Sequence, residues 1–277
     1  MKPPPGAPMI LGAMPWPLRV TRLGSVSLER LAAAEDGHGR VHSVFDHAIN
    51  ILWHDGRLLT LLGSAHLAAP FAVALFELPS RDVVTPGSRI RRSDFDCNQS
   101  EVVRLEMPRG PLVFHPASLP GPPCGRALSS GAGRRARRAL GKSLAARDFS
   151  AFAEAAGQLI GLGEGLTPAG DDFVLGTLAA IHRLAPEWLR KNRVHCDGLL
   201  SAAGGRTTNV ARDFLLEAMA GRFSEPVLDL LTARTEDLAN RAARELLGLG
   251  ATSGADTLAG IQLGCRSLGA ASVPVIA

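Results

Sequence analysis

Short apolar runs separated by turn-forming residues occupy the first part of the chain. They are VHSVFDHAINILW at 41–53, RLLTLLG at 57–63, FAVALFEL at 71–78 and EVVRLEM at 101–107. Short runs rich in β-branched and aromatic residues and bounded by Gly, Pro, Asp and Ser are typical of strands. The pattern predicts a β-rich lobe over residues 26–115, folded as a sheet or a partial barrel.

The hydrophobic spacing changes to a helical period from about residue 148 onward. Five positions at i, i+4, i+7, i+8 and i+11 share one helix face: Phe173, Thr177, Ala180, Ile181 and Leu184. Further helices are predicted at 148–160, 207–221, 224–233 and 235–248, the last three with Thr or Ser as capping residues in front. We therefore expect an α-helical lobe over 148–277, and the α+β class overall.

The segments outside these two lobes have the composition of connecting chain. Residues 1–25 are rich in Pro and are predicted to be an irregular arm. Residues 116–147 combine a Pro- and Gly-rich linker with the basic run RRARRALGKSLAAR at 134–147. A basic run of this kind is typical of a solvated helix face, and contact with a polyanion is the alternative interpretation.

The overall composition is globular and argues against nucleic acid as a partner. Hydrophobic residues make up 46% of the chain and charged residues 20%. Aromatic residues are only 5%, with no Tyr, so aromatic platforms for single-stranded nucleic acid are not expected. The net charge of +4 comes mainly from 134–147, so the chain lacks a broad basic surface.

The cysteines and the hydropathy point to the cytoplasm. Cys97, Cys124, Cys196 and Cys265 are widely spaced and form no CxxC pair, so neither a cysteine zinc site nor a disulfide framework is expected. The start of the chain is too rich in Pro for a signal peptide, and no apolar run reaches the ~18 residues of a membrane span.

Two parts of the helical half resemble each other. LIGLGEGLTPAGDDFVLGTLAAI at 159–181 and LLGLGATSGADTLAGIQL at 246–263 both read as a helix end, GLG, a short loop containing Thr, then Gly, one residue, Asp and a second helix. When Gly170 is aligned with Gly254, Asp172 falls on Asp256 and Gly176 falls on Gly260. Since this separation exceeds any solenoid period, we expect a facing pair of helix–loop–helix units.

The first of these loops, GLGEGLTPAGDDFVLG at 161–176, is the strongest candidate site. Glycines permit close approach of the backbone, and a glycine-rich loop that leads into a helix is typical of phosphate binding. Thr167, Asp171 and Asp172 add side-chain oxygens there and are the candidate catalytic residues, while Gly163, Gly165 and Gly170 are candidate phosphate-binding residues. A Mg²⁺ held by the two aspartates and a phosphate would relieve their mutual repulsion.

The same residues also suit a structural role. Asp stabilises the first turn of a helix, and glycines end the preceding helix. A cap needs one glycine and this stretch has five, which favours a ligand site. No standard nucleotide motif fits, because GLGEGL lacks the third glycine of GxGxxG and ALGKS at 139–143 lacks the first glycine of a P-loop.

Other candidates are less specific. Arg206 with Thr207 or Thr208 could clamp a carboxylate or phosphate, although a threonine before a helix is also an ordinary cap. His47 and Asn50 could line a site, and packing or surface positions are the alternative for both. In the second loop, the candidates are Ser253, Gly254 and Asp256.

GLGEGLTPAGDDF resembles the signature G-x-G-x-G-L-T-P-[SA]-G-D-D-[FL] of the bacterial AllH-type family, which is associated with oxamate carbamoyltransferase. HGRVHSVFDHAINIL resembles the opening block of that family, RTTNVARDFLLEAMAG its T-T-x-x-S helix, and LGLGATSGADTLAGI its closing block. The chain departs from the helix pattern at Asn209 and Ala211, where Ser is more usual. The resemblance covers about residues 38–265.

The resemblance implies a subunit of a phosphorolytic carbamoyltransferase of allantoin breakdown, acting with other subunits. Such an enzyme converts oxalurate and phosphate to oxamate and carbamoyl phosphate. The loop at 161–172 is then the first site, and Gly254 with Asp256 the second. A non-catalytic assembly subunit, or one that binds a small anion, is the alternative expectation.

Overall fold

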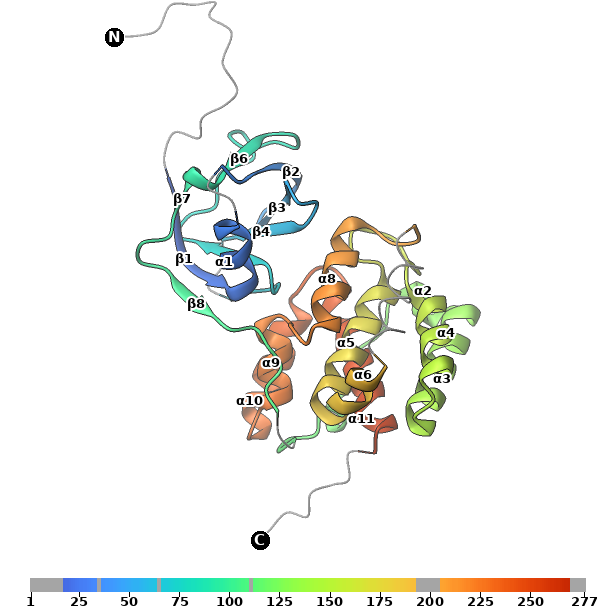
Figure 1. The fold of residues 1–277 in the computed structure, drawn as a ribbon. Coiled ribbons are helices and arrows are strands. Elements are labelled where there is room, and N and C mark those ends of the chain that lie inside the picture. Colours follow the sequence, from blue (N-terminus) through green and yellow to red (C-terminus); the bar gives the residue numbers. More distant parts are fainter. Residues whose placement is uncertain (1–16, 34–35, 64–65, 110–111, 193–204, 270–277) are drawn as a thin grey trace, which may run out of the picture. The chain divides into compact units, whose positions relative to one another are not determined.

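The computed structural model describes residues 17–33, 36–63, 66–109, 112–192 and 205–269. The chain divides into two compact units, residues 1–104 and 105–277 (Figure 1). The first is β-rich and the second is helical, which confirms the predicted α+β class. Among the described residues, no helix is both long and apolar enough to cross a membrane.

The first unit is a nearly closed mixed sheet. Its elements are β1 (Leu18–Gly24), α1 (Ser25–Ala32), β2 (His38–Val44), β3 (Ala48–Trp53), β4 (Leu58–Leu62), β5 (Ala72–Leu75), β6 (Arg89–Arg91), the 3-10 turn η1 (Arg92–Asp94), β7 (Phe95–Asp96) and β8 (Glu101–Val103). The strand order is β6-β2-β3-β4-β5-β1-β7, and β8 also pairs with β1. The meander β2-β3-β4 is antiparallel, whereas β4 and β5 run parallel.

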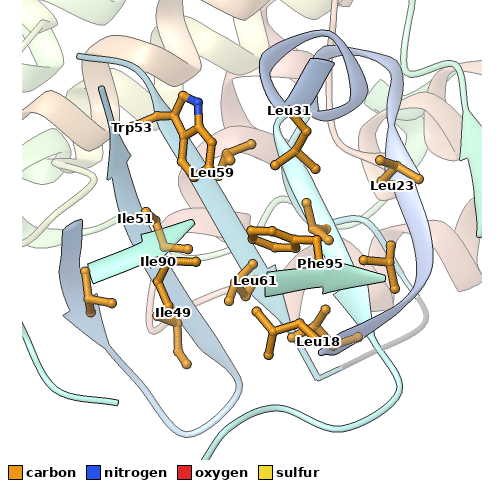
Figure 2. Close-up of a cluster of buried hydrophobic side chains, with 14 of the residues drawn as sticks. Leu18, Leu23, Leu31, Ile49, Ile51, Trp53, Leu59, Leu61, Ile90 and Phe95 are labelled. Atoms are coloured by element: carbon orange, nitrogen blue, oxygen red, sulfur yellow. The ribbon is translucent and has the colours of Figure 1, made fainter. Parts of the chain in front are cut away.

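The core of this unit lies inside the curved sheet (Figure 2). Ile49, Ile51 and Trp53 alternate along β3 and point into it, as the period of two along a strand requires. Leu31 contributes from α1, and Phe95 packs edge-on against Trp53 with ring centroids 6.4 Å apart. This cluster gives the unit a hydrophobic core of its own.

The second unit is built from helices. They are α2 (Arg126–Ser129), α3 (Gly131–Ala146), α4 (Phe149–Leu159), α5 (Ala169–Leu184), α6 (Pro186–Lys191), α8 (Asn209–Met219), α9 (Glu225–Thr232), α10 (Glu236–Leu247) and α11 (Ser253–Ser267), preceded by the 3-10 turn η2 (Pro116–Ser118). Thr208 and Thr235 cap α8 and α10 through their side chains, as predicted. Ser224 occupies the cap position of α9 but makes no capping bond.

Helix α5 is the centre of the helical unit. Every residue from Ala169 to Ile181 is buried, so other elements cover it on all sides. Its closest neighbour is α11, and the two backbones touch at Gly176 and Gly260. A Cβ added at Gly176 would lie 2.0 Å from the carbonyl oxygen of Thr257, and only glycine permits this approach.

Three segments differ from the sequence-based expectation. Strand β1 begins at Leu18, so the predicted irregular arm over 1–25 was wrong from that residue on. The expected linker and basic run contain α2 and α3. The compact units divide after Arg104 rather than after residue 115.

Candidate functional site

The two similar loops of the sequence have the same local structure. In the first, the N–H of Gly170 donates to the carbonyl oxygen of Leu162 at 2.8 Å; in the second, the N–H of Gly254 donates to that of Leu249 at 3.0 Å. Both loops lead into a long helix, α5 or α11, and these helices pack together. The internal similarity therefore corresponds to two related units that face each other across the Gly176–Gly260 contact.

The loop at 161–168 depends on glycine conformations. Gly161, Gly163 and Gly165 have positive φ angles of 79°, 125° and 94°, a region that side chains disfavour. A Cβ at Gly161 would also lie 2.0 Å from the carbonyl oxygen of Arg206, so the loop packs against the backbone that precedes α8. Gly163 and Gly165 are exposed and form the outer turn of the loop.

Hydrogen bonds within the loop already occupy the N–H groups of the second, third and fourth residues of α5. Besides the Gly170 bond to Leu162, the N–H groups of Asp171 and Asp172 both donate to the carbonyl oxygen of Pro168, at 2.9 and 3.2 Å. The helix start therefore does not offer these donors to an anion, contrary to the expectation from the sequence. Within the described part of the chain, the N–H groups of residues 163–167 make no hydrogen bond, so the turn itself supplies the free donors.

Asp171 braces the loop from the start of α5. One carboxylate oxygen, Oδ2, accepts a hydrogen bond from the N–H of Gly161 at 2.8 Å. Burial raises the pKa of Asp171, while the Gly161 N–H, the nearby Thr207 hydroxyl and the charge of Arg206 oppose that rise. Among the described residues, the other oxygen, Oδ1, is buried and has no hydrogen-bond partner.

Asp172 faces the second loop. Burial raises the pKa of Asp172 well above its ordinary value, and the charges of Asp256 and Asp171 raise it further. The hydroxyls of Ser253 and Thr167, which lie 2.7 Å apart and are hydrogen-bonded to each other, oppose this shift. Oδ2 of Asp172 is also buried without a partner among the described residues.

Asp256 is the counterpart of Asp172 on α11. Its Oδ1 accepts a hydrogen bond from the N–H of Gly125 at 2.8 Å, whereas Oδ2 has no partner in the described structure. Burial raises the pKa of Asp256, and the Gly125 N–H, the Thr252 hydroxyl and the charge of Arg137 oppose it. The two related loops thus place Asp172 and Asp256 close enough to influence each other electrostatically.

Two residues near Asp256 were missed by the sequence interpretation. Gly125 lies in the segment that composition marked as a linker. Arg137 lies in the basic run, yet its guanidinium stacks over the ring of Phe173, 5.2 Å from the centroid. A detectable signal existed, because Arg137 follows Gly133 by four residues and precedes Leu140 by three, which places it beside the buried face of α3.

The segment before α8 completes the junction. The Thr208 side chain accepts a hydrogen bond from the Ala211 N–H at 3.0 Å and donates one to the carbonyl oxygen of Leu166. The cap of α8 is thereby joined to the glycine loop. Thr207 is half-buried, its hydroxyl has no partner among the described residues, and Arg206 is exposed.

We call this meeting of residues 161–172, 206–208 and 252–256 with Gly125 the three-loop junction. It brings together the following predicted residues: Gly163, Gly165, Thr167, Gly170, Asp171, Asp172, Arg206, Thr207, Thr208, Ser253, Gly254 and Asp256. The interior of the junction holds carboxylate oxygens and hydroxyl groups, and its outer turn holds backbone N–H groups that make no hydrogen bond among the described residues.

His47 and Asn50 belong to the other compact unit. The Asn50 side chain donates to the Ser43 hydroxyl at 3.1 Å and accepts from the Thr60 hydroxyl at 2.8 Å, so its amide joins neighbouring strands. His47 is exposed in the turn between β2 and β3. These contacts give Asn50 a structural role in the sheet.

A metal site gains no support from the grouping of side chains. Across the described ranges, no three His, Cys, Asp or Glu residues come together in an arrangement that could hold a metal ion. The Mg²⁺ expected at Asp171 and Asp172 would take phosphate oxygens in place of a third protein ligand, so it stays a prediction.

Two family models match the chain. A model described as the AllH family N-terminal domain matches residues 19–106, and one described as oxamate carbamoyltransferase subunit AllH matches residues 159–265. The second match includes both related loops and α8. No solved structure matches the chain.

Proposed function

This chain belongs to the AllH family, and on that premise we propose that it is a subunit of an oxamate carbamoyltransferase-type enzyme whose three-loop junction binds the anionic substrate. The reaction we propose is carbamoyl transfer between an oxalurate-type molecule and phosphate, in the breakdown of allantoin. Other subunits of such an enzyme are the expected partners.

One observation carries the proposal: Asp171, Asp172 and Asp256 each bury a carboxylate oxygen that lacks a hydrogen-bond partner among the described residues. An unsatisfied buried acceptor costs about 1–3 kcal/mol, so such groups are retained where a ligand or water supplies the missing donor. Oxamate and oxalurate carry amide N–H groups, and a carboxylate oxygen can accept a hydrogen bond from such a group. The free N–H groups of residues 163–167 suit the phosphate.

The raised pKa of Asp172 suits it to proton transfer. In the proposed reaction, a phosphate oxygen attacks the ureido carbonyl carbon of oxalurate, and the bond from that carbon to the oxamate nitrogen breaks. The departing nitrogen must gain a proton, and a buried carboxyl group with a raised pKa can donate it. In the reverse direction the Asp172 carboxylate takes that proton back.

The test is an assay of carbamoyl phosphate formation from oxalurate and phosphate, with the chain purified together with its partner subunits. We expect Asp172→Asn to abolish activity, while Asp237→Asn, which changes an exposed aspartate in the first turn of α10, leaves it unchanged. Full activity of Asp172→Asn would contradict the proposal.

The alternative is a non-catalytic assembly or anion-binding subunit. The bonds from Gly161 to Asp171 and from Gly125 to Asp256 favour it, because they give both carboxylates a bracing role. It predicts that Asp172→Asn alters thermal stability or assembly but not turnover in the complete complex.

A further inference from the structure

A cluster of arginines lies at one edge of the sheet in the N-terminal unit. Strand β6 is the edge strand and pairs antiparallel with β2. Ile90, its central residue, points into the core (Figure 2). Because side chains alternate along a strand, the exposed Arg89 and Arg91 project from the opposite face.

The pairing of these strands sets two arginines directly opposite each other. The register places Arg40 opposite Arg89, and His38 opposite Arg91. Like charges directly across a sheet are destabilising, so this arrangement lowers the stability of the strand pair. Elsewhere in the same unit, Arg81 pairs with Asp46 at 2.7 Å. Within the described residues, Arg89, Arg91 and Arg92 form no such ion pair.

These side chains line a surface cavity of about 420 Å³ that is open to solvent. Its lining includes His38, Arg89, Arg91, Arg92 and Ser93, with Asp36 as the one carboxylate. The backbone around it is held by two hydrogen bonds of 2.7 Å, from the Arg92 N–H to the Gly37 carbonyl oxygen and from the Arg91 N–H to the Asp94 carboxylate. The arginines therefore project from a fixed frame.

We propose that this cavity binds a small molecule that carries two or more phosphoryl groups. Guanidinium groups form paired hydrogen bonds with phosphate oxygens, and three of them together compensate several negative charges. The volume suits a small ligand. Duplex nucleic acid would need a longer basic track than a three-residue strand and its turn provide. The site lies wholly in the N-terminal unit and does not depend on the proposed carbamoyl transfer.

Exposed charges on an edge strand also prevent sheets from joining edge to edge. That role requires exposed charge, but it does not require that several arginines line one cavity. The experiment therefore has to separate binding from solubility.

The test is isothermal titration of inorganic pyrophosphate into the full chain. We expect saturable binding that weakens by at least about tenfold in the double variant Arg89→Ala/Arg91→Ala. The double variant Arg89→Lys/Arg91→Lys keeps the charges but loses the paired donors, so it should bind with intermediate strength. Arg81→Ala, which removes an exposed arginine of the same unit, should bind as the unchanged chain does. Thermal unfolding of each variant confirms that it is folded.

Three outcomes would overturn the proposal. The first is the absence of saturable pyrophosphate binding by the unchanged chain at millimolar concentration. The second is binding of unchanged strength in Arg89→Ala/Arg91→Ala, which would show that the phosphate binds elsewhere in the chain. The third is steeply salt-dependent binding of duplex DNA with which pyrophosphate does not compete.

Discussion

Gly176 and Gly260 occupy equivalent positions on α5 and α11, and each is pressed against the other helix. A Cβ at Gly176 would lie 2.0 Å from the Thr257 carbonyl oxygen, and one at Gly260 would lie 2.1 Å from that of Phe173. Thr257 and Phe173 are themselves equivalent in the two related units. The contact is therefore reciprocal, and a side chain on either glycine must force the helices apart.

We expect Gly260→Ala to lower the free energy of unfolding by about 3 kcal/mol or more, because the carbonyl it would meet is backbone and cannot move alone. Urea unfolding measures the loss. Gly131→Ala is the matched control, since a Cβ at this helical glycine meets only the end of the Arg135 side chain, at 3.5 Å. An equal effect of both substitutions would show that the contact is looser than described.

The stability of the chain should depend on pH through Asp172. Its pKa is raised in the folded state because the carboxyl group is buried, so the folded state holds the proton more tightly than the unfolded state does. The free energy of unfolding should therefore fall as pH rises from the ordinary value near 3.8 through the raised pKa. Asp172→Asn should flatten this fall and be more stable than the unchanged chain at neutral pH. A lower stability of Asp172→Asn than of the unchanged chain at neutral pH would contradict this prediction.

The same substitution separates stability from activity. If Asp172 transfers the proton in the proposed reaction, Asp172→Asn should lower turnover by at least about a hundredfold, the usual contribution of a general acid. The turnover number is measured with saturating oxalurate and phosphate. A change confined to KM would instead assign Asp172 to substrate binding.

Thr208 joins α8 to the glycine loop, and its removal should affect both. Thr208→Ala removes the helix cap and the donor to Leu166, and we expect a loss of about 1–2 kcal/mol in the free energy of unfolding. A protease specific for glutamate should then cut faster after Glu164 in the exposed turn. Thr208→Ser keeps the hydroxyl and should behave like the unchanged chain. Equal cleavage rates in the unchanged chain, Thr208→Ala and Thr208→Ser would show that Thr208 does not hold the glycine loop in place.

The cysteines should differ in reactivity. Burial raises the pKa of Cys265 to about 12, so almost none of it is the reactive thiolate at neutral pH. We expect iodoacetamide to modify Cys265 only after denaturation, and Cys97 and Cys124, which are partly exposed, in the folded chain. Mass spectrometry of digested protein reads out each site, in a Cys196→Ser background because Cys196 lies outside the described residues. Equal labelling of Cys265 and Cys124 before denaturation would contradict the packing around α11.

The sequence predicted the fold class and the family, and it pointed to the loops that meet at the three-loop junction, because these depend on periodicity and on short motifs. It missed β1, since an irregular register between Val20 and Arg22 breaks the alternation that marks a strand. The sequence also led to a wrong expectation about which backbone N–H groups are free to bind an anion. The carbonyls that accept from the N–H groups of Gly170, Asp171 and Asp172 belong to Leu162 and Pro168, and their direction follows from the folded loop, which spacing does not encode.

Arg137 and Gly125 show a second limit of prediction from the sequence. Both approach Asp256 only because α3 and the turn before α2 pack beside α11, more than 100 residues later in the sequence. Single-sequence patterns describe neighbours along the chain. A guanidinium in a basic run therefore resembles its solvated neighbours until tertiary packing places it over Phe173.

The burial of α5 from Ala169 to Ile181 has a consequence for motion. Backbone amides in a helix that is covered on every side exchange with solvent only when the whole cooperative unit opens, whereas amides in an exposed turn exchange at once. Gly163 to Gly165 and the start of α5 are only a few residues apart, so hydrogen exchange should change abruptly between them. The turn can then move alone, without any unfolding of the helix that carries Asp171 and Asp172.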